Sequence, residues 1–241
     1  MKQHRYIYSS VVIFAIWFTL SLLLKLNYIP SPVATIVYIG QHINEIFAHV
    51  SMSLYRIMIA MILTILLGTW CGVMTARVDV MDRSLTPLFY TLYPIPKIAF
   101  LPILMLLLGI GNASKIALVS LILFFQIVIT IRDSVKNIHP SYYLSIKSLG
   151  ASKSDIYRHV IIPAMLPSLF TALRLSVGTS ISVLFFAENY ATQLGIGYFI
   201  MDSWLKINYT AMFAGVVVIS LMGSLIFAAL DMLESKICNW V

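Results

Sequence analysis

The stretch from residue 133 to residue 167 reads DSVKNIHPSYYLSIKSLGASKSDIYRHVIIPAMLP, and the sequence on both sides of it is apolar for long runs. Charged and titratable side chains occur throughout the stretch, and Gly150 lies near its centre. Each charge buried in hydrocarbon costs several kcal/mol unless it finds a partner or water. We therefore expect this segment to leave the membrane and to act in water.

The composition indicates a polytopic membrane protein. The 241 residues are 60% hydrophobic and 10% charged, with a mean hydropathy of +0.94, whereas a soluble domain has about 25% charged residues. A net charge of +7 is compatible with a nucleic-acid partner. The Lys and Arg excess of cytoplasmic loops in membrane proteins also explains it. We expect a single transmembrane domain, residues 1–241, in a lipid membrane and without nucleic acid.

Long apolar runs predict an all-α chain with six transmembrane helices, because about 20 apolar residues cross a bilayer. The N-terminal run is too long for the core of a signal peptide and lacks a small-residue cleavage site, so it is expected to stay as the first span. We expect an amphipathic surface helix at residues 33–49 and a short polar loop at residues 77–83. The six spans are expected at residues 7–26, 51–75, 85–109, 115–131, 167–186 and 210–233.

Two spans carry features that predict their packing. The third contains prolines at positions 94, 96 and 102 together with Lys97, so we expect a distorted helix whose loosened backbone needs protein or water around it. The second contains Gly68 and Gly72 in a G-x-x-x-G pattern. This spacing lets another helix approach closely, and packing within the chain is favoured over dimerisation.

The distribution of Lys and Arg fixes the orientation of six spans. One side carries eleven basic residues and the other side four, with Lys97 inside a span. Cytoplasmic loops carry the excess, so both termini and the central polar loop, residues 132–167, are expected in the cytoplasm. The eleven are Lys2, Arg5, Arg77, Arg83, Arg132, Lys136, Lys147, Lys153, Arg158, Arg174 and Lys236, and the four are Lys25, Arg56, Lys115 and Lys206.

The polar loop itself has the local signals of two short helices. Residues 142–149 have helical propensity, and Gly150 can adopt the left-handed conformation that ends a helix. Ser152 and Asp155 have the spacing of a capping box, which starts a second helix. A helical knob of this kind can dock in a groove of another protein. The alternative is a loop that only links two spans, but such connections are usually short.

We expect the second helix of the knob to end at Pro163 and Pro167, which would turn the chain back toward the membrane. The next span would then begin at Pro167.

Four short motifs follow one another along the chain. They read IPSP from residue 29, PIPKIAFLP from residue 94, SLGAS from residue 148 and LGIGY from residue 194. Together they resemble the inner-membrane permeases of binding-protein-dependent ABC importers, in the branch for nitrate, sulfonate, taurine and bicarbonate. The resemblance implies a type I ABC importer permease fold (MetI-like), with six spans and both termini in the cytoplasm of a bacterial inner membrane.

The resemblance also implies the partners. Two permease copies, expected as a homodimer, would enclose the path, and an extracytoplasmic binding protein would deliver a small organic or inorganic anion or a related small metabolite. Separate ATP-binding cassette ATPase subunits would bind ATP and magnesium, so no cofactor is expected in this chain. The residues implied in ATPase coupling are Leu144, Ser145, Ile146, Lys147, Ser148, Leu149, Gly150, Ala151, Ser152, Asp155, Ile156 and Tyr157.

The chain departs from the family at one point of this loop. The family's E-A-A triplet falls on Leu144-Ser145-Ile146, so the acidic residue is absent. The replacement implies either a more apolar contact at Leu144 or a partner that has changed in compensation.

Catalytic signatures are missing from the sequence. It contains no G-x-x-x-x-G-K-[ST] loop for nucleotide phosphates and no G-x-S-x-G elbow, so an enzyme is not expected. The histidines lack metal-ligand spacing and are expected on the surface rather than at a metal. A secondary carrier or channel is the alternative function, but the halves of the chain do not mirror each other as carrier repeats do. The histidines are His4, His42, His49, His139 and His159.

Charged and hydroxyl side chains in the spans are candidates for the substrate path. Lys97 either reaches the surface or a structural partner, or faces a water-filled path and attracts an anion. Glu188 either belongs to the path or is a solvated helix end or the ion-pair partner of Arg56. Ser176 and Ser180, like the neighbouring hydroxyls of the fifth span, either line a polar path or let helices pack closely.

Overall fold

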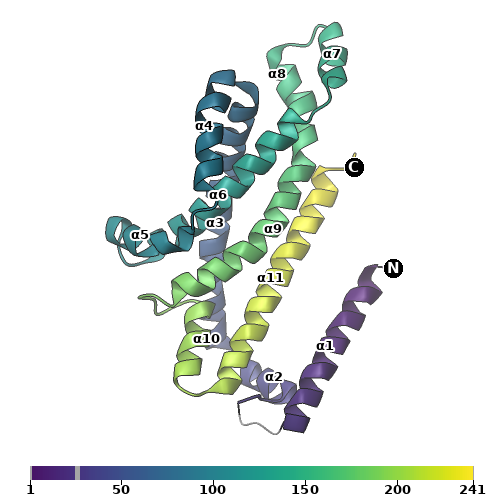
Figure 1. Ribbon diagram of the computed structural model, residues 1–241. Helices are drawn as coiled ribbons and strands as arrows, with labels where there is room; N and C mark the ends of the chain where they lie inside the picture. Colours follow the sequence, from purple (N-terminus) through teal and green to yellow (C-terminus); the bar gives the residue numbers. More distant parts are fainter. Residues whose placement is uncertain (1, 25–27, 241) are drawn as a thin grey trace. The chain divides into compact units, whose positions relative to one another are not determined.

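A computed structural model describes residues 2–24 and 28–240, and the side chains of all of these except residues 2–10 and 24. The described residues form helices and no strand, in the order shown in Figure 1. The α-helices, with a 3₁₀ turn η1 and a π-helical turn η2, are α1 (Lys2–Leu24), α2 (Pro32–Gln41), α3 (Ile43–Arg77), α4 (Asp79–Leu92), η1 (Lys97–Phe100), α5 (Leu101–Leu108), α6 (Asn112–Lys136), α7 (Pro140–Ser148), α8 (Lys153–Ile156), η2 (Tyr157–Ile161), α9 (Ile162–Glu188), α10 (Ile196–Leu205) and α11 (Tyr209–Ile237).

The chain divides into two compact units, each with its own packing. The first unit comprises Met1–Leu54 and Glu188–Met222, and the second comprises Tyr55–Ala187 and Gly223–Val241. The second unit therefore contains the bent third span, all of α6, all of α9 except Glu188, and the polar loop.

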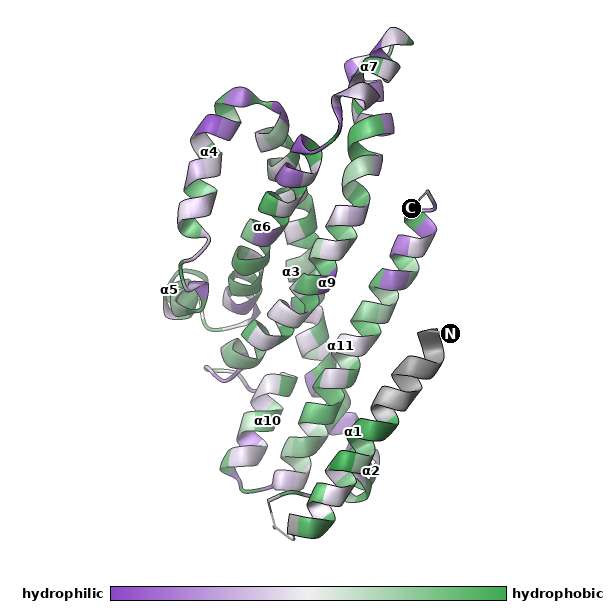
Figure 2. Cartoon of the chain, turned by 45° about the vertical axis from the view of Figure 1, so that its right-hand side comes forward, coloured by the Kyte–Doolittle hydropathy of each residue, from purple (hydrophilic) through white to green (hydrophobic). Residues whose placement is uncertain are grey.

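Four helices among the described residues are long and apolar enough to cross a membrane, and a bent pair of helices makes a fifth if it counts as one span. Figure 2 shows their predominantly hydrophobic colouring, with hydrophilic residues gathered at α7 and at the start of α4. The expected first span is the helix α1, whose described apolar stretch is only Val11–Leu23; residues 25 and 26 of that prediction lie outside the described residues. The four long apolar helical segments are Ile43–Arg77, Asn112–Lys136, Lys153–Glu188 and Tyr209–Ile237.

Two predicted boundaries in the first third of the chain are wrong. The amphipathic helix expected at residues 33–49 ends at Gln41, and its last residues belong to the long helix α3. The loop expected at residues 77–83 is helical except for Val78. Asp79 and Asp82 lie in the first turn of α4, where negative charge is stabilised by the helix dipole, so these polar residues start a helix instead of interrupting one.

The third span is broken, as its prolines predict. α4 ends at Leu92, η1 begins after Pro96, and the two halves of the span meet at 90°. Tyr93, before Pro94, still has helical dihedral angles (φ −58°, ψ −47°), and the helix ends here because Pro94 and Pro96 have no backbone N–H with which to continue it. Pro102 is accepted because it lies in the first turn of α5, where a backbone N–H has no partner to lose.

The prediction that Pro163 and Pro167 end a helix is wrong. Neither proline ends the helix, because one continuous helical segment runs from Lys153 to Glu188. The π-helical turn of residues 157–161 directly precedes Pro163. This wider turn takes up the irregularity, since proline lacks an N–H and needs space at the turn before it.

Close contact between α3 and α6 accounts for the G-x-x-x-G pattern. A Cβ atom added at Gly72 would lie 2.8 Å from Ile131 Cβ and 2.9 Å from the Val128 carbonyl oxygen. At Gly68 it would lie 3.1 Å from Ile127 Cγ2. The pattern therefore serves packing within the chain, as expected.

We predict that Gly72→Ala lowers the stability of the purified protein by about 1–3 kcal/mol, because the added methyl overpacks a contact with backbone on the other side. The measurement is the Tm in detergent. Gly40→Ala is the matched control, because Gly40 is also helical and nothing lies within 4 Å of an added Cβ. Equal Tm values for the two variants would contradict the packing role of Gly72.

Candidate functional site

The polar loop is a helical hairpin whose turn depends on Gly150. Gly150 has φ +76°, a conformation that L side chains rarely adopt. Its N–H donates to the Lys147 carbonyl at 3.0 Å, and the Ala151 N–H donates to the Ile146 carbonyl at 3.3 Å. This pair of hydrogen bonds is a Schellman motif, and it ends α7 as the sequence predicts.

Side chains cap the starts of both helices of the hairpin. Ser152 and Asp155 form a full capping box: the Asp155 N–H donates to Ser152 Oγ at 3.3 Å, and the Ser152 N–H donates to Asp155 Oδ2 at 2.9 Å. α7 starts with Pro140 at its first position, after His139, whose Nδ1 accepts from the Ser141 N–H at 3.3 Å. Capping by neighbouring side chains thus fixes where α7 and α8 begin.

Three large apolar side chains are exposed on the hairpin among its polar residues. Leu144 is 68% exposed, Leu149 85% and Tyr142 64%. Ile156 is instead buried, so its side chain anchors the hairpin and is not presented to a partner. The other expected coupling residues are exposed or half-buried, and they are Ser145, Ile146, Lys147, Ser148, Gly150, Ala151, Ser152, Asp155 and Tyr157.

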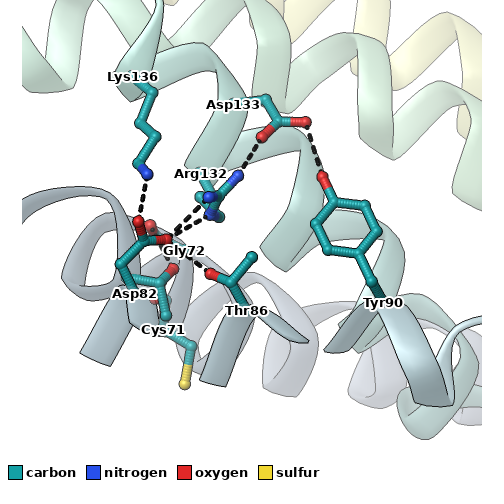
Figure 3. Close-up of polar contacts among 9 residues, drawn as sticks. Cys71, Gly72, Asp82, Thr86, Tyr90, Arg132, Asp133 and Lys136 are labelled. Atoms are coloured by element: carbon teal, nitrogen blue, oxygen red, sulfur yellow. Dashed lines mark hydrogen bonds and ion pairs between the residues drawn. The ribbon is translucent and has the colours of Figure 1, made fainter. Parts of the chain in front are cut away.

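Charged side chains at the start of α4 and at the end of α6 contact one another (Figure 3). Asp82 on α4 accepts from Arg132 Nη2 at 2.8 Å and from Thr86 Oγ1 at 2.7 Å, and it also pairs with Lys136. Arg132 Nη1 donates to Asp133 Oδ1 at 2.8 Å. The network therefore joins the start of α4 to the end of α6.

A cation–π contact connects the hairpin to α3. The guanidinium carbon of Arg77, the last residue of α3, lies 5.0 Å from the ring centre of Tyr143 on α7. The sequence predicts neither this contact nor the Asp82 network, because it predicts a loop at residues 77–83. The signal available in the sequence was that acidic residues, Asp79 and Asp82, precede the third apolar run, whereas basic residues, Arg132 and Lys136, follow the fourth.

Lys97 lies at the break of the third span, where it caps the end of α4. Its Nζ donates to the carbonyl oxygens of Tyr93 at 2.7 Å, Leu92 at 3.1 Å and Ile95 at 3.5 Å. It also lies 4.6 Å from the ring centre of Phe125. Of the two roles open for Lys97, the contacts favour structural pairing.

The two candidate serines of α9 have different surroundings, although both are buried. Ser180 Oγ donates to the carbonyl of Val177 in its own helix at 2.9 Å. Ser176 Oγ points toward Gln126 Oε1 on α6 at 3.5 Å. Ser180 is thus satisfied locally, whereas Ser176 touches a polar side chain of another span.

Glu188, in the first unit, is fully buried and is not a solvated helix end. Its carboxylate accepts from Ser53 Oγ at 2.8 Å and from the Gly197 N–H at 2.9 Å. The Ser53 hydroxyl oxygen in turn accepts from the Ile196 N–H at 2.8 Å. Glu188 and Ser53 together therefore satisfy the first backbone N–H groups of α10.

His49 joins the same cluster, so the expected surface position is wrong for this histidine. His49 is buried, and its Nδ1 lies 3.1 Å from both the N–H and the carbonyl oxygen of Gly195. Gly195 has φ +149°, and a Cβ there would lie 2.3 Å from the Glu188 carboxyl carbon. The sequence signal was the L-G-I-G pattern, which leaves room for a side chain beneath it.

Long apolar helices, a bent span and an exposed helical hairpin define a polytopic helical membrane protein. Residues 64–238 match the family described as binding-protein-dependent transport system inner membrane component, and the chain belongs to this family. The expected resemblance is therefore confirmed, and the family is one of transport permeases, not of known enzymes.

Curated relatives share a quarter to a third of their residues with the chain. The taurine transport system permease protein of Escherichia coli is 29% identical over 81% of this chain and 71% of its own length. A putative aliphatic sulfonates transport permease of Bacillus subtilis is 28% identical over 95% and 84%. The formylaminopyrimidine transport permease of Halalkalibacterium halodurans is 29% identical over 88% and 85%.

Solved structures show the same fold at low sequence identity. A chain of a bacterial ABC transporter for the import of the acidic polysaccharide alginate superposes with a TM-score of 0.68 at 15% identity, over 98% of this chain and 97% of that one. A chain of an inward-facing MetNI methionine ABC transporter gives 0.64 at 19% identity, over 77% and 92%. The expected MetI-like permease fold is thus confirmed at the level of overall architecture.

We predict that Lys97→Met lowers the Tm of the purified protein, because three carbonyl oxygens lose their donor inside an apolar region. Each buried polar group left without a partner costs about 1–3 kcal/mol. Lys236→Met, at an exposed position near the end of α11, is the control. An unchanged Tm together with loss of anion binding would contradict the capping role and favour an anion path.

We predict that Gly195→Ala displaces the Glu188 carboxylate and loosens the start of α10. Hydrogen exchange at the Ile196 and Gly197 amides should accelerate, and the Tm should fall. Gly111→Ala is the matched control, since Gly111 also precedes a helix but has extended φ and open space at its Cβ. Protection of the α10 amides that is unchanged in Gly195→Ala would refute the clash.

Proposed function

We propose that this chain is the membrane-spanning permease subunit of an ATP-driven importer, with ATP hydrolysed on separate ATP-binding cassette subunits. The observation that carries the proposal is the exposed apolar hairpin α7–α8 in a chain of this family that has no nucleotide-binding loop of its own. A permease that does not hydrolyse ATP itself needs a surface at which a separate ATPase subunit can bind and move it.

In the proposed topology, six helices span a bacterial inner membrane, and both termini and the hairpin lie in the cytoplasm. The excess of Lys and Arg on the hairpin side supports this orientation. Two copies of the chain, as a homodimer, would enclose the path, and an extracytoplasmic binding protein would deliver substrate to the opposite surface, including residues 193–206.

The ATPase is proposed to bind the exposed surface of the hairpin around Leu144, on α7, and Leu149, directly after it. Both leucines are largely exposed, and an exposed apolar patch on a helix is typical of an interaction site. Since Leu144 replaces the family's acidic residue, the groove of the partner is expected to be apolar at this point instead of offering a basic side chain.

Movement of the hairpin would reach the spans through two contacts. Tyr143 lies against Arg77 at the end of α3, and the Asp82 network holds the end of α6, just before α7, against α4. Closure of the ATPases on ATP would move α7, and these contacts would transmit the load to three helices. The permease would thereby alternate between inward-open and outward-open states.

The substrate is proposed to be a small polar molecule of the kind that the relatives' names describe. Those names fall into two chemistries, since taurine and aliphatic sulfonates carry an anionic sulfonate, whereas formylaminopyrimidine contains an aromatic ring. The binding protein, which is a separate chain, would set most of the selectivity.

The test combines partner capture with transport. Affinity purification of the tagged chain from native membranes is expected to recover an ATPase of the ABC class, and proteoliposomes of that complex should take up substrate only with ATP. Gly150→Pro is expected to insert into the membrane but to lose assembly or to hydrolyse ATP without transport, because proline cannot adopt φ +76°.

Gly150→Asn is the matched control, because asparagine tolerates the left-handed conformation and nothing lies within 4 Å of an added Cβ. It should transport like the unmodified protein. Wild-type transport by Gly150→Pro would refute the coupling role of the hairpin. Transport down an ion gradient by the purified chain alone would show a secondary carrier instead.

A further inference from the structure

A cavity of about 510 Å³ lies in the second unit, between the break of the third span and the helices α6 and α9. Its volume is within the range of small-molecule sites. The lining includes four aliphatic side chains, and the rings of Tyr93 and Phe186, each about half exposed, also border it. Three polar side chains, Gln126, Thr179 and Ser182, also face it.

Gln126 supplies hydrogen-bond donors to this cavity. It lies near the middle of the 25-residue helix α6, where a polar amide is costly unless it is hydrogen-bonded or faces a polar space. Its Oε1 is contacted by Ser176 Oγ at 3.5 Å. Within the described residues its Nε2 has no hydrogen-bond partner, so two N–H groups remain for a ligand.

The aliphatic hydroxyl groups of the lining, on Thr179 and Ser182, supply acceptors only, whereas the phenol hydroxyl of Tyr93 can donate or accept. Thr179 Oγ1 donates its single hydrogen to the Leu175 carbonyl at 3.2 Å, and Ser182 Oγ donates to the Gly178 carbonyl at 2.9 Å. A hydroxyl has one hydrogen and two lone pairs. Both hydroxyls can therefore receive a hydrogen bond from a ligand, but neither has a hydrogen left to give.

Lys97 borders the cavity, but its donors are already committed. An ammonium group has three N–H bonds, and those of Lys97 are directed at the three carbonyl oxygens of residues 92, 93 and 95. The described lining thus combines two aromatic rings, of which Tyr93 also bears a hydroxyl group, one amide that donates, two aliphatic hydroxyls that accept, and no cation with a donor to spare.

We propose that this cavity binds an uncharged, planar heteroaromatic molecule that carries amino donors and ring-nitrogen acceptors, such as an aminopyrimidine. The assignment rests on the proposed function, whose substrate class it narrows. Ring nitrogens would accept from Gln126, amino groups would donate to Thr179 and Ser182, and the ring would lie against Tyr93 or Phe186.

Acceptor-only anions fit this lining poorly. The oxygens of nitrate or of a sulfonate cannot donate a hydrogen bond, so they would face the lone pairs of both hydroxyls. They would also give up their hydration for the amide of Gln126 and the hydroxyl of Tyr93, while the hydrogens of Lys97 stay on backbone carbonyls. An ionised group taken out of water without charge-assisted hydrogen bonds is strongly disfavoured.

The test is direct binding to the full-length chain in lipid nanodiscs, measured by titration calorimetry with 4-aminopyrimidine, nitrate and ethanesulfonate as probes. We expect binding of 4-aminopyrimidine that neither anion displaces. Phe186→Leu, which keeps apolar volume but removes the ring, should raise its Kd by about tenfold. Gln126→Leu should raise it by roughly fivefold, through the lost hydrogen bonds.

Phe227→Ala is the matched control, because Phe227 is an exposed ring on α11 that does not line the cavity. Its Kd should equal that of the unmodified protein. The assignment is overturned if 4-aminopyrimidine does not bind, if its affinity is unchanged in both cavity variants, or if the anions bind and lose affinity in Gln126→Leu.

Binding is measured without ATP or partner subunits, so its outcome is separate from that of the proposed function. If an ATPase co-purifies with the chain but the anions occupy the cavity, only the assignment of the substrate class fails. If 4-aminopyrimidine binds as expected but no ATPase is recovered, the proposed function fails and the site remains.

Discussion

The ammonium group of Lys97 holds the broken third span in its bent form. Hydrocarbon offers no hydrogen-bond partners, so a helix that stops inside a span leaves carbonyl groups that the protein itself must satisfy. Prolines 94 and 96 break the helix, and Lys97 returns three donors to the carbonyls of residues 92, 93 and 95. The turn of the chain at this point, which brings η1 and α5 against α6, thus depends on one side chain.

Two further groups of charges follow the same arrangement, because they meet a helix end whose dipole has the opposite sign. Lys97 caps the carbonyl end of α4, and Asp82 lies at the amino end of that helix beside Arg132 and Lys136 in the last turns of α6. In the first unit, Glu188 accepts from an N–H at the amino end of α10. Helix ends provide partial charges where water is scarce, so charged residues placed there can be buried or half-buried without being functional ligands.

Sequence patterns predicted the features that depend on neighbouring residues and failed where distant residues meet. The turn at Gly150, the capping box of Ser152 and the break before Lys97 follow from local backbone chemistry, and all three are confirmed. The predicted end of the helix at Pro163 was wrong because a π-helical turn, which no local signal announces, accommodates the proline. The burial of His49 could not be predicted, since its partner Gly195 lies 146 residues away, and the hydrogen-bond directions at Gln126 depend on Ser176 from another span.

The proposed docking surface and the proposed binding cavity are connected by one helix, α4, which continues through Pro87 in its interior. α4 has 14 residues and is therefore about 21 Å long. Near its start, Asp82 ties it to the end of α6 from which the hairpin emerges, and at its end the carbonyl groups held by Lys97 border the cavity. A displacement of the hairpin that moved Asp82 would shift the far end of α4 as well, because a hydrogen-bonded helix transmits load along its axis with little compression. Lys97 would then move with the backbone that it caps, and the cavity would change shape without any substrate-binding side chain being displaced directly by the motor.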